Sequence, residues 1–202
     1  MKKLLFAIGL LLGQLNGWAQ TEKGRWNVGV SIGSFSYQSA ETGHSFSGSL
    51  SPSVGRFIAP NLLLGVGVPL SLTSSKFTYP QNSINNRSVT IGLSPFVRYY
   101  LGASALKPYI GTAVGYSYSD YRNETALSVS TNKGTILQVS PSVGLAYFIN
   151  RTVSVDAQVS YNWASFKSKS TSSSGGGSTT DNPATTYKNA SLSLGFNLFF
   201  GQ

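Results

Sequence analysis

The chain has 202 residues, with 15 lysines and arginines against 6 aspartates and glutamates, and it contains no cysteine. This length fits one domain, and the lack of cysteine excludes a disulfide framework. The basic residues are dispersed between apolar segments instead of clustering on one face or helix, which argues against a nucleic-acid-binding protein.

An apolar run at the N-terminus predicts export. Two lysines precede the run from Leu4 to Leu12, and the small residues around Ala19 offer a cleavage site. This pattern is typical of a signal peptide. We predict that residues 1–19 are a signal peptide and residues 20–202 the mature domain, with 13 basic residues against 6 acidic ones. An uncleaved anchor is the alternative, although the run is shorter than the roughly 20 apolar residues of a spanning helix.

Four segments repeat one pattern of serine, apolar residue and glycine that runs into an aromatic-rich end. They begin at Ser51, Ser94, Ser140 and Ser191, so the spacings are 43, 46 and 51 residues. Apolar and small residues alternate within each segment, which predicts a strand. The spacing fits two strands of about ten residues with one short and one long connection. The repeating unit is therefore predicted to be a β-hairpin, and four hairpins give eight strands.

The same alternation places the strands and their connections. Strands are predicted at about residues 25–37, 45–58, 62–74, 88–101, 107–120, 135–149, 152–166 and 187–200. Short turns are predicted at residues 59–61, 102–106 and 150–151, and long polar loops near residues 38–44, 75–87, 121–134 and 167–186. The last loop includes a Gly/Ser-rich run, residues 172–178, which we expect to be flexible. Short turns at one end and long loops at the other are typical of an outer-membrane barrel.

The two faces of the predicted strands differ in size and polarity. One face carries bulky apolar residues such as Leu64 and Leu194, and the other carries small ones such as Ser51 and Gly92. The lumen of eight strands is narrow, so the small residues fit inside and the bulky residues face outward, which is tolerable only against lipid. We therefore predict an all-β fold, an eight-stranded antiparallel up-and-down transmembrane β-barrel.

Aromatic residues are predicted to form two outward belts, as membrane interfaces favour. The belt at the short-turn end comprises Trp26, Phe57, Tyr99, Tyr100, Tyr109, Tyr147, Phe148 and Phe200. The belt at the long-loop end comprises Phe35, Tyr37, Phe46, Tyr116, Tyr118, Tyr121, Tyr161, Trp163, Phe166 and Tyr187. Prolines recur at one place in the repeat, where a missing N–H would interrupt the ladder, and we predict a shared bulge or twist there: Pro52, Pro95 and Pro141.

With these features the chain resembles the small outer-membrane β-barrel proteins of Gram-negative bacteria, a porin-family group that includes OmpX and the OmpA membrane domain. The terminal strand from Ser191 to Phe200 is similar to the aromatic-ended signal by which the barrel-assembly machinery recognises such proteins. The resemblance implies an integral outer-membrane protein, a monomer with both termini periplasmic, in contact with lipid and lipopolysaccharide. It implies no single activity, since the group has structural, adhesive, porin-like and enzymatic members.

Two charged residues are candidates for a site in the lumen. Arg98 and Asp156 both fall on the lumen face near the short-turn end, so we expect them to meet at similar depth. Four further side chains are predicted to complete a polar network with them: Gln138, Gln158, Asn197 and Tyr109. We favour a structural plug held by pairing of the charges. A gate or polar pathway is the alternative.

The predicted long loops carry an excess of cations that suits contact with anionic lipopolysaccharide. These cations are Lys76, Arg87, Arg122, Lys133, Lys167, Lys169 and Lys188. We predict no cofactor, metal or nucleic-acid partner. The preferred function is a non-enzymatic envelope-structural or surface-interaction role, and a narrow porin-like diffusion channel is the alternative. A lipid A-modifying enzyme ranks third, because it would depend on the single histidine, His44, with Glu41 nearby.

Overall fold

The structure, a computed structural model, describes residues 21–79, 82–173 and 178–201. The predicted signal peptide, residues 1–19, lies outside these ranges, as do residues 174–177 of the Gly/Ser-rich run. Within the ranges described, the chain forms no helix that is long and apolar enough to cross a membrane.

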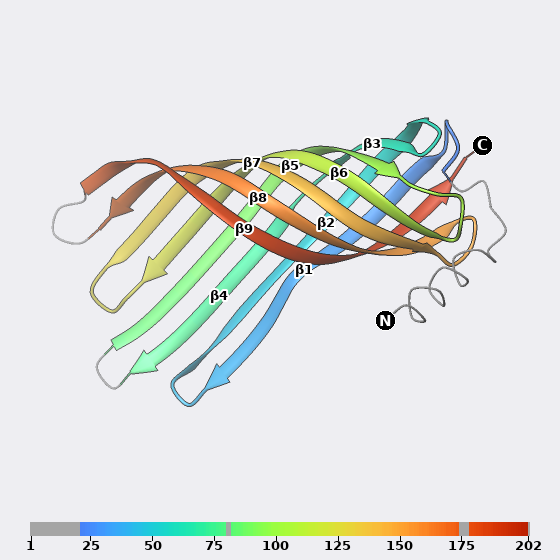
Figure 1. Ribbon diagram of the computed structural model, residues 1–202. Helices are drawn as coiled ribbons and strands as arrows, with labels where there is room; N and C mark the ends of the chain where they lie inside the picture. The colour runs from blue at the N-terminus through green and yellow to red at the C-terminus, as the bar shows by residue number, and fades with distance from the viewer. Residues whose placement is uncertain (1–20, 80–81, 174–177, 202) are drawn as a thin grey trace, which may run out of the picture.

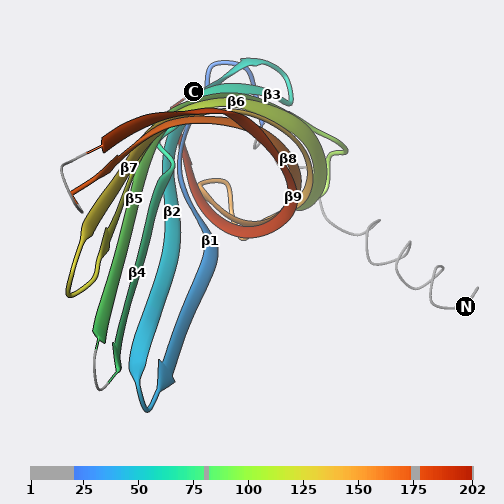
Figure 2. The same cartoon turned by 90° about the vertical axis from the view of Figure 1, so that its left-hand side faces the viewer.

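The described residues form nine antiparallel strands that close into a ring (Figures 1 and 2). Their bounds are β1 (Trp26–Ala40), β2 (Gly43–Ala59), β3 (Leu62–Gly67), β4 (Leu70–Tyr79), β5 (Asn82–Tyr100), β6 (Leu106–Glu124), β7 (Val129–Phe148), β8 (Val153–Ser172) and β9 (Ser178–Phe200). β1 pairs with β2 on one side and with β9 on the other, which closes the sheet.

β3 and β4 are two halves of one barrel strand. Both pair with β2 on one side and with β5 on the other, and the strand is interrupted only at Val68 and Pro69. The ring therefore has eight members. The predicted eight-stranded antiparallel up-and-down barrel is confirmed.

The strands are much longer than the sequence predicted. A membrane-spanning strand needs about 9–11 residues, whereas β8 has 20 and β9 has 23. The segments predicted as long loops are largely strand, joined by short turns such as residues 41–42 and 125–128. The prediction of long loops was wrong because their polarity marks where the strands leave the lipid. Hydrogen-bonded pairing continues beyond that point, as in β6–β7 up to Glu124 and Val129.

These extensions project together from one end of the barrel. In Figure 1 the hairpin ends of β1–β2, β4–β5, β6–β7 and β8–β9 lie at the left, and β1 begins and β9 ends at the right. Figure 2 looks along the barrel and shows the closed ring with the extensions leaning to one side. The molecule therefore has a closed, compact end and an end of long hairpins.

The assignment of the two faces holds along the barrel, with bulky apolar side chains outside. Leu192 and Leu194 are each 63% exposed, whereas the lumen-facing Ser160 is 6% exposed. The aromatic belt at the short-turn end is only partly as predicted. Four members point outward and are exposed: Trp26, Tyr99, Tyr147 and Phe200. The other four are buried in the lumen, so their assignment to the belt was wrong: Phe57, Tyr100, Tyr109 and Phe148.

The recurring prolines do not mark bulges. The register of β5–β6 is the same on both sides of Pro95, and that of β7–β8 is the same on both sides of Pro141. Instead, the β5–β6 ladder lacks pairs at Pro95 and the β7–β8 ladder lacks them at Pro141, as expected for a residue without an N–H, although both prolines pair on their other side. The register shifts lie elsewhere, including one in β1 between Ile32 and Phe35.

Candidate functional site

Four aromatic side chains fill the lumen at the short-turn end. Phe57, Tyr100, Phe148 and Phe199 come from β2, β5, β7 and β9, and none is more than 2% exposed. They form a closed cycle, with ring centroids 5.8 Å apart for Phe57–Tyr100, 6.3 Å for Tyr100–Phe148, 5.1 Å for Phe148–Phe199 and 6.1 Å for Phe199–Phe57. These distances are typical of packed aromatic pairs. We call this group the aromatic plug.

An ion pair spans the lumen next to the aromatic plug. Nη1 of Arg98 on β5 lies 3.1 Å from Oδ2 of Asp156 on β8, and the side chains are 17% and 4% exposed. The Tyr109 hydroxyl donates to Oδ2 at 2.8 Å, and the Asn197 amide donates to Oδ1 at 3.2 Å. Nη2 of Arg98 donates to Oε1 of Gln158 at 3.0 Å. The structure thus brings five of the six predicted network residues together.

Gln138 belongs to a second network. Its Nε2 donates to Oγ of Ser140 at 2.7 Å and to Oδ1 of Asn162 at 3.1 Å. Asn162 in turn donates to Asn189 at 2.9 Å and to Ser191 at 3.0 Å. This network lies further along the strands toward the hairpin end, so grouping Gln138 with the ion pair was wrong.

Six large side chains of the two networks each face a glycine on a neighbouring strand, whereas Asn162 faces Asn189. The direct partners are Arg98 and Gly111, Tyr109 and Gly144, Gln158 and Gly144, Asp156 and Gly195, Asn197 and Gly29, and Gln138 and Gly115. The fit is tight at some of them. A Cβ on Gly195 would lie 1.8 Å from Oδ1 of the aspartate, and one on Gly144 would lie 2.2 Å from Cζ of the tyrosine. The glycines therefore make the room in which the network assembles.

A cavity of about 170 Å³ lies in the lumen beyond the ion pair. Arg98, Phe96 and Gln158 contribute to its lining, together with serine side chains from several strands. The Arg98 guanidinium carbon lies 5.2 Å from the Phe96 ring centroid, within range of a cation–π contact. The site therefore combines a small hydroxyl-lined space with one paired cation.

The sequence reasoning missed several lumen residues. Asn27 donates to Asn197 at 3.3 Å and extends the network to β1. Two buried cations lie at the short-turn end: Arg25, which donates to the carbonyl of Arg151 at 2.8 Å, and Lys107, which donates to that of Gly102 at 3.3 Å. Burial lowers the pKa of the Arg25 guanidinium from its ordinary value. Alternation was the available signal, since Lys107 shares the face of Tyr109.

The seven predicted loop cations lie on strands instead of loops. By alternation with the exposed apolar residues of their own strands, they project from the outer face of the extensions. Three of them pair with acids: Lys133 with Asp120 at 3.6 Å, Lys169 with Asp181 at 3.3 Å, and Arg122 with Glu124 at 2.5 Å. The remaining four are Lys76, Arg87, Lys167 and Lys188.

No metal centre forms among the residues that the structure describes, since no three His, Cys, Asp or Glu side chains come close enough to share an ion. His44 lies near the tip of the β1–β2 hairpin, where it pairs in register with Ser39 and Lys76. With Glu41 it lines a separate hollow of about 540 Å³.

This closed eight-membered barrel, apolar outside and polar inside, agrees with a family comparison. The profile described as the outer membrane protein beta-barrel domain matches residues 5–200. The chain belongs to this family. A comparison with curated protein sequences returned no match.

Solved structures of outer-membrane barrels share the fold of this family member. A major outer membrane protein from Thermus thermophilus aligns with a TM-score of 0.57 and 16% identity, over 89% of this chain and 100% of that chain. OprG from Pseudomonas aeruginosa aligns with a TM-score of 0.53 and 14% identity, over 91% of this chain and 99% of that chain. Neisserial surface protein A aligns with a TM-score of 0.48 and 20% identity, over 86% of this chain and 95% of that chain. At these identities the first two likenesses show a common fold and no common activity.

Proposed function

We propose that this outer-membrane barrel is non-enzymatic, has a closed lumen, and serves an envelope-structural or surface-interaction role. The aromatic plug is the observation that carries the proposal. Four rings at most 2% exposed, in a closed cycle, occupy the narrow end of the lumen. Fully burying a large apolar side chain stabilises a fold by about 1.5–3 kcal/mol, so opening this end would cost several such contributions at once.

The buried ion pair supports the same proposal. Asp156 accepts three hydrogen bonds, from Arg98, Tyr109 and Asn197, which link β5, β6, β8 and β9 across the lumen. A gate has to exchange such contacts for others at little cost, whereas separating a buried, fully bonded pair is expensive. The network therefore connects strands across the lumen and stabilises the closed barrel.

A narrow diffusion channel is the second candidate, favoured by the hydroxyl-lined cavity beyond the ion pair. Single-channel recording of the purified barrel in planar bilayers separates the two. We expect no discrete conductance steps from the wild-type protein. The double variant Phe57→Ala/Phe199→Ala, which removes half of the aromatic plug, serves as the positive control. Discrete steps in the wild type would overturn the closed-lumen proposal.

We further propose a monomer whose termini are periplasmic, delivered by the barrel-assembly machinery through its terminal strand β9. Short turns face the periplasm in barrels of this kind, and here β1 begins and β9 ends beside the short turns (Figure 1). Because the chain has no cysteine, single cysteines can report orientation. On intact cells, a membrane-impermeant maleimide should label Glu41→Cys at a hairpin tip and spare Ala103→Cys in a short turn. The reverse pattern would contradict this orientation.

A further inference from the structure

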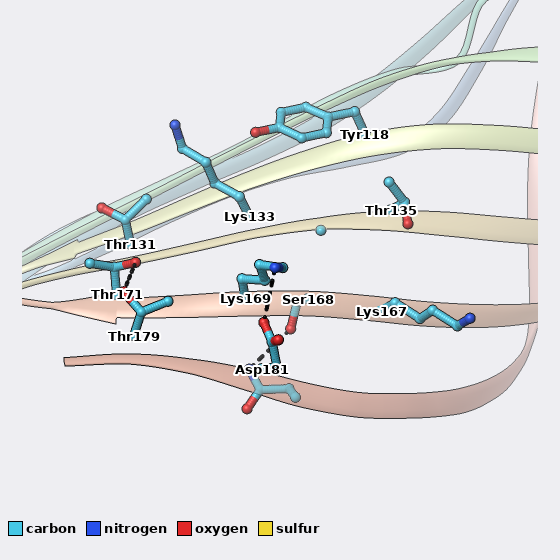
Figure 3. Close-up of a pocket in the computed structure, with 12 residues that line it drawn as sticks. Tyr118, Thr131, Lys133, Thr135, Lys167, Ser168, Lys169, Thr171, Thr179 and Asp181 are labelled. Carbon is cyan, nitrogen blue, oxygen red and sulfur yellow. Dashed lines mark hydrogen bonds and ion pairs between the residues drawn. The ribbon is translucent and has the colours of Figure 1, made fainter.

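A basic groove lies on the outer face of the barrel extensions formed by β6 to β9 (Figure 3). Its volume is about 750 Å³, and its lining includes Lys133 from β7, Lys167 and Lys169 from β8, and Tyr118 from β6. Asp181 from β9 also lines it. In Figure 3 Lys169 is turned toward Asp181, and Lys167 extends along β8 away from Lys133. We call it the β6–β9 groove.

Two lysines of the β6–β9 groove stand side by side in a cross-strand row that an acid closes at each end. Lys133 and Lys169 are direct cross-strand partners on β7 and β8, a placement of like charges that is unfavourable without an anion. Their acids, Asp120 and Asp181, stand at the two outer ends of this four-strand row. These ion pairs are exposed and weak. An incoming anion at the centre of the row would therefore compete only with these two weak ion pairs for the ammonium groups.

Lys167 adds a third ammonium group one row nearer the membrane. It shares the outer face with Lys169, and its cross-strand neighbour is Thr135, which in turn faces Tyr118 on β6. The row of Lys167 thus continues into the tyrosine of the aromatic belt. The groove lining thus holds three lysines against one acid, Asp181, and this excess of positive charge favours a ligand with several anionic oxygens.

The position of the β6–β9 groove along the barrel axis indicates which layer of the membrane it faces. The outward aliphatic residues of β8 give way to aromatic Trp163, and Lys167 follows four residues later. At about 3.3 Å per residue and a strand tilt of about 45°, this places Lys167 roughly 9 Å beyond the belt along the barrel axis. Lysine side chains also bend toward the interface. The groove therefore faces the headgroup layer of the outer leaflet instead of the lumen.

We propose that the β6–β9 groove binds the phosphate groups of a phosphorylated outer-leaflet glycolipid of the lipid A type. The inference rests on the proposed surface role and gives that role a chemical partner. Lysine binds phosphate as a point charge, and each lysine near an anionic membrane surface contributes about fivefold in affinity. The acyl chains of such a lipid would lie along the aliphatic outer wall below the groove.

The test is a binding titration of the full chain, folded in nanodiscs of neutral lipid, with bisphosphorylated lipid A as the probe. We expect Lys167→Gln/Lys169→Gln to bind it roughly 25-fold more weakly than the wild type. The matched control, Lys76→Gln/Arg87→Gln, removes the same charge from the outer face of β4 and β5 and should stay within about threefold. Should the double groove variant lose heat-modifiable gel migration, Lys167→Gln alone should still weaken binding about fivefold.

Three results would overturn the assignment. Equal weakening in the groove and control variants would mean diffuse attraction to the whole surface. Equal affinity for dephosphorylated lipid A would mean that phosphate is not recognised. Inorganic phosphate binding as tightly as the lipid would make the groove a site for free phosphate. Conductance measured on the same samples tests the lumen separately. A barrel that does not conduct and does not prefer lipid A refutes the groove proposal alone. A barrel that conducts and prefers lipid A refutes the closed-lumen proposal alone.

Discussion

Removing one charge of the lumen pair should destabilise the barrel far more than removing both. In Arg98→Met, Asp156 keeps the hydrogen bonds from Tyr109 and Asn197 but loses the cation that pairs with it, at a side-chain exposure of 4%. In Asp156→Asn, the shape is kept and the arginine loses its counterion. Breaking a buried pair in this way costs about 3–5 kcal/mol.

The double variant Arg98→Met/Asp156→Asn should recover much of that loss. Both charges are gone, and the new amide can still accept from Tyr109 and bond with Asn197. What remains is the loss of the arginine's bond to Gln158, about 1–3 kcal/mol for one unsatisfied group. The single changes should therefore add to considerably more than the double change, with a coupling free energy of about 3 kcal/mol or more.

Urea unfolding in thin-bilayer vesicles measures these values, with the lipid-facing Trp26 and Trp163 as fluorescence reporters. With an m-value of about 2 kcal/mol/M, each single change should lower the midpoint by roughly 1.5–2.5 M. The exposed pair Arg122 and Glu124 is the control, and Arg122→Met should cost at most about 1 kcal/mol. The structural role of the ion pair would be refuted if a single lumen change lowered the free energy of unfolding by less than this control. It would also be refuted if the loss in the double variant equalled the sum of the two single losses.

Three further changes probe the lumen and the outer wall. Gly195→Ala should cost about 1–3 kcal/mol, because its Cβ would lie 1.8 Å from a carboxylate oxygen, whereas Gly115→Ala, whose nearest neighbour is 3.6 Å away, should be nearly neutral in the same unfolding assay. Leu194→Lys, in the middle of the outer apolar band, should cost about 2–4 kcal/mol and Phe200→Lys, at its edge, at most about 1 kcal/mol; equal costs would contradict the membrane placement. Phe199→Ala should cost about 3–5 kcal/mol, as expected for a fully buried ring.

The alternation of residues was enough to predict the architecture. A period of two survives along most of each strand, so the faces of Leu194 and Ser160 follow from counting alone. The strand ends did not follow, because the serine-, threonine- and asparagine-rich extensions look like loops when polarity is the criterion. Thr131 and Thr171 illustrate this: they are polar and outside the membrane, yet they pair across β7 and β8.

The sequence was enough to predict which residues face the lumen, but not which of them contact each other there. Arg98 and Asp156 were expected at similar depth because both lie near short turns. Gln138 has the same parity, but its place along β7 brings it to Asn162 instead. The aromatic plug was missed because adjacent aromatics such as Tyr99 and Tyr100 were treated as one belt, although successive side chains on a strand must face opposite ways. Applying that rule to each pair would have predicted the plug.

The pairing of six large lumen residues with glycines also bears on how the ring finds its correct alignment. When β9 meets β1 to close the barrel, Asn197 faces Gly29, and on the other side of β9 Gly195 faces Asp156. A slip of two residues would keep every side chain on its own face, so hydrophobicity alone does not oppose it. That slip would, however, place the asparagine against Asn27 or Ser31 and the aspartate against Ser193 or Asn197. The glycines thus favour a single register of the closing strands, because only there does each large side chain meet a residue without one. A chain that lacks these glycines would close in several registers.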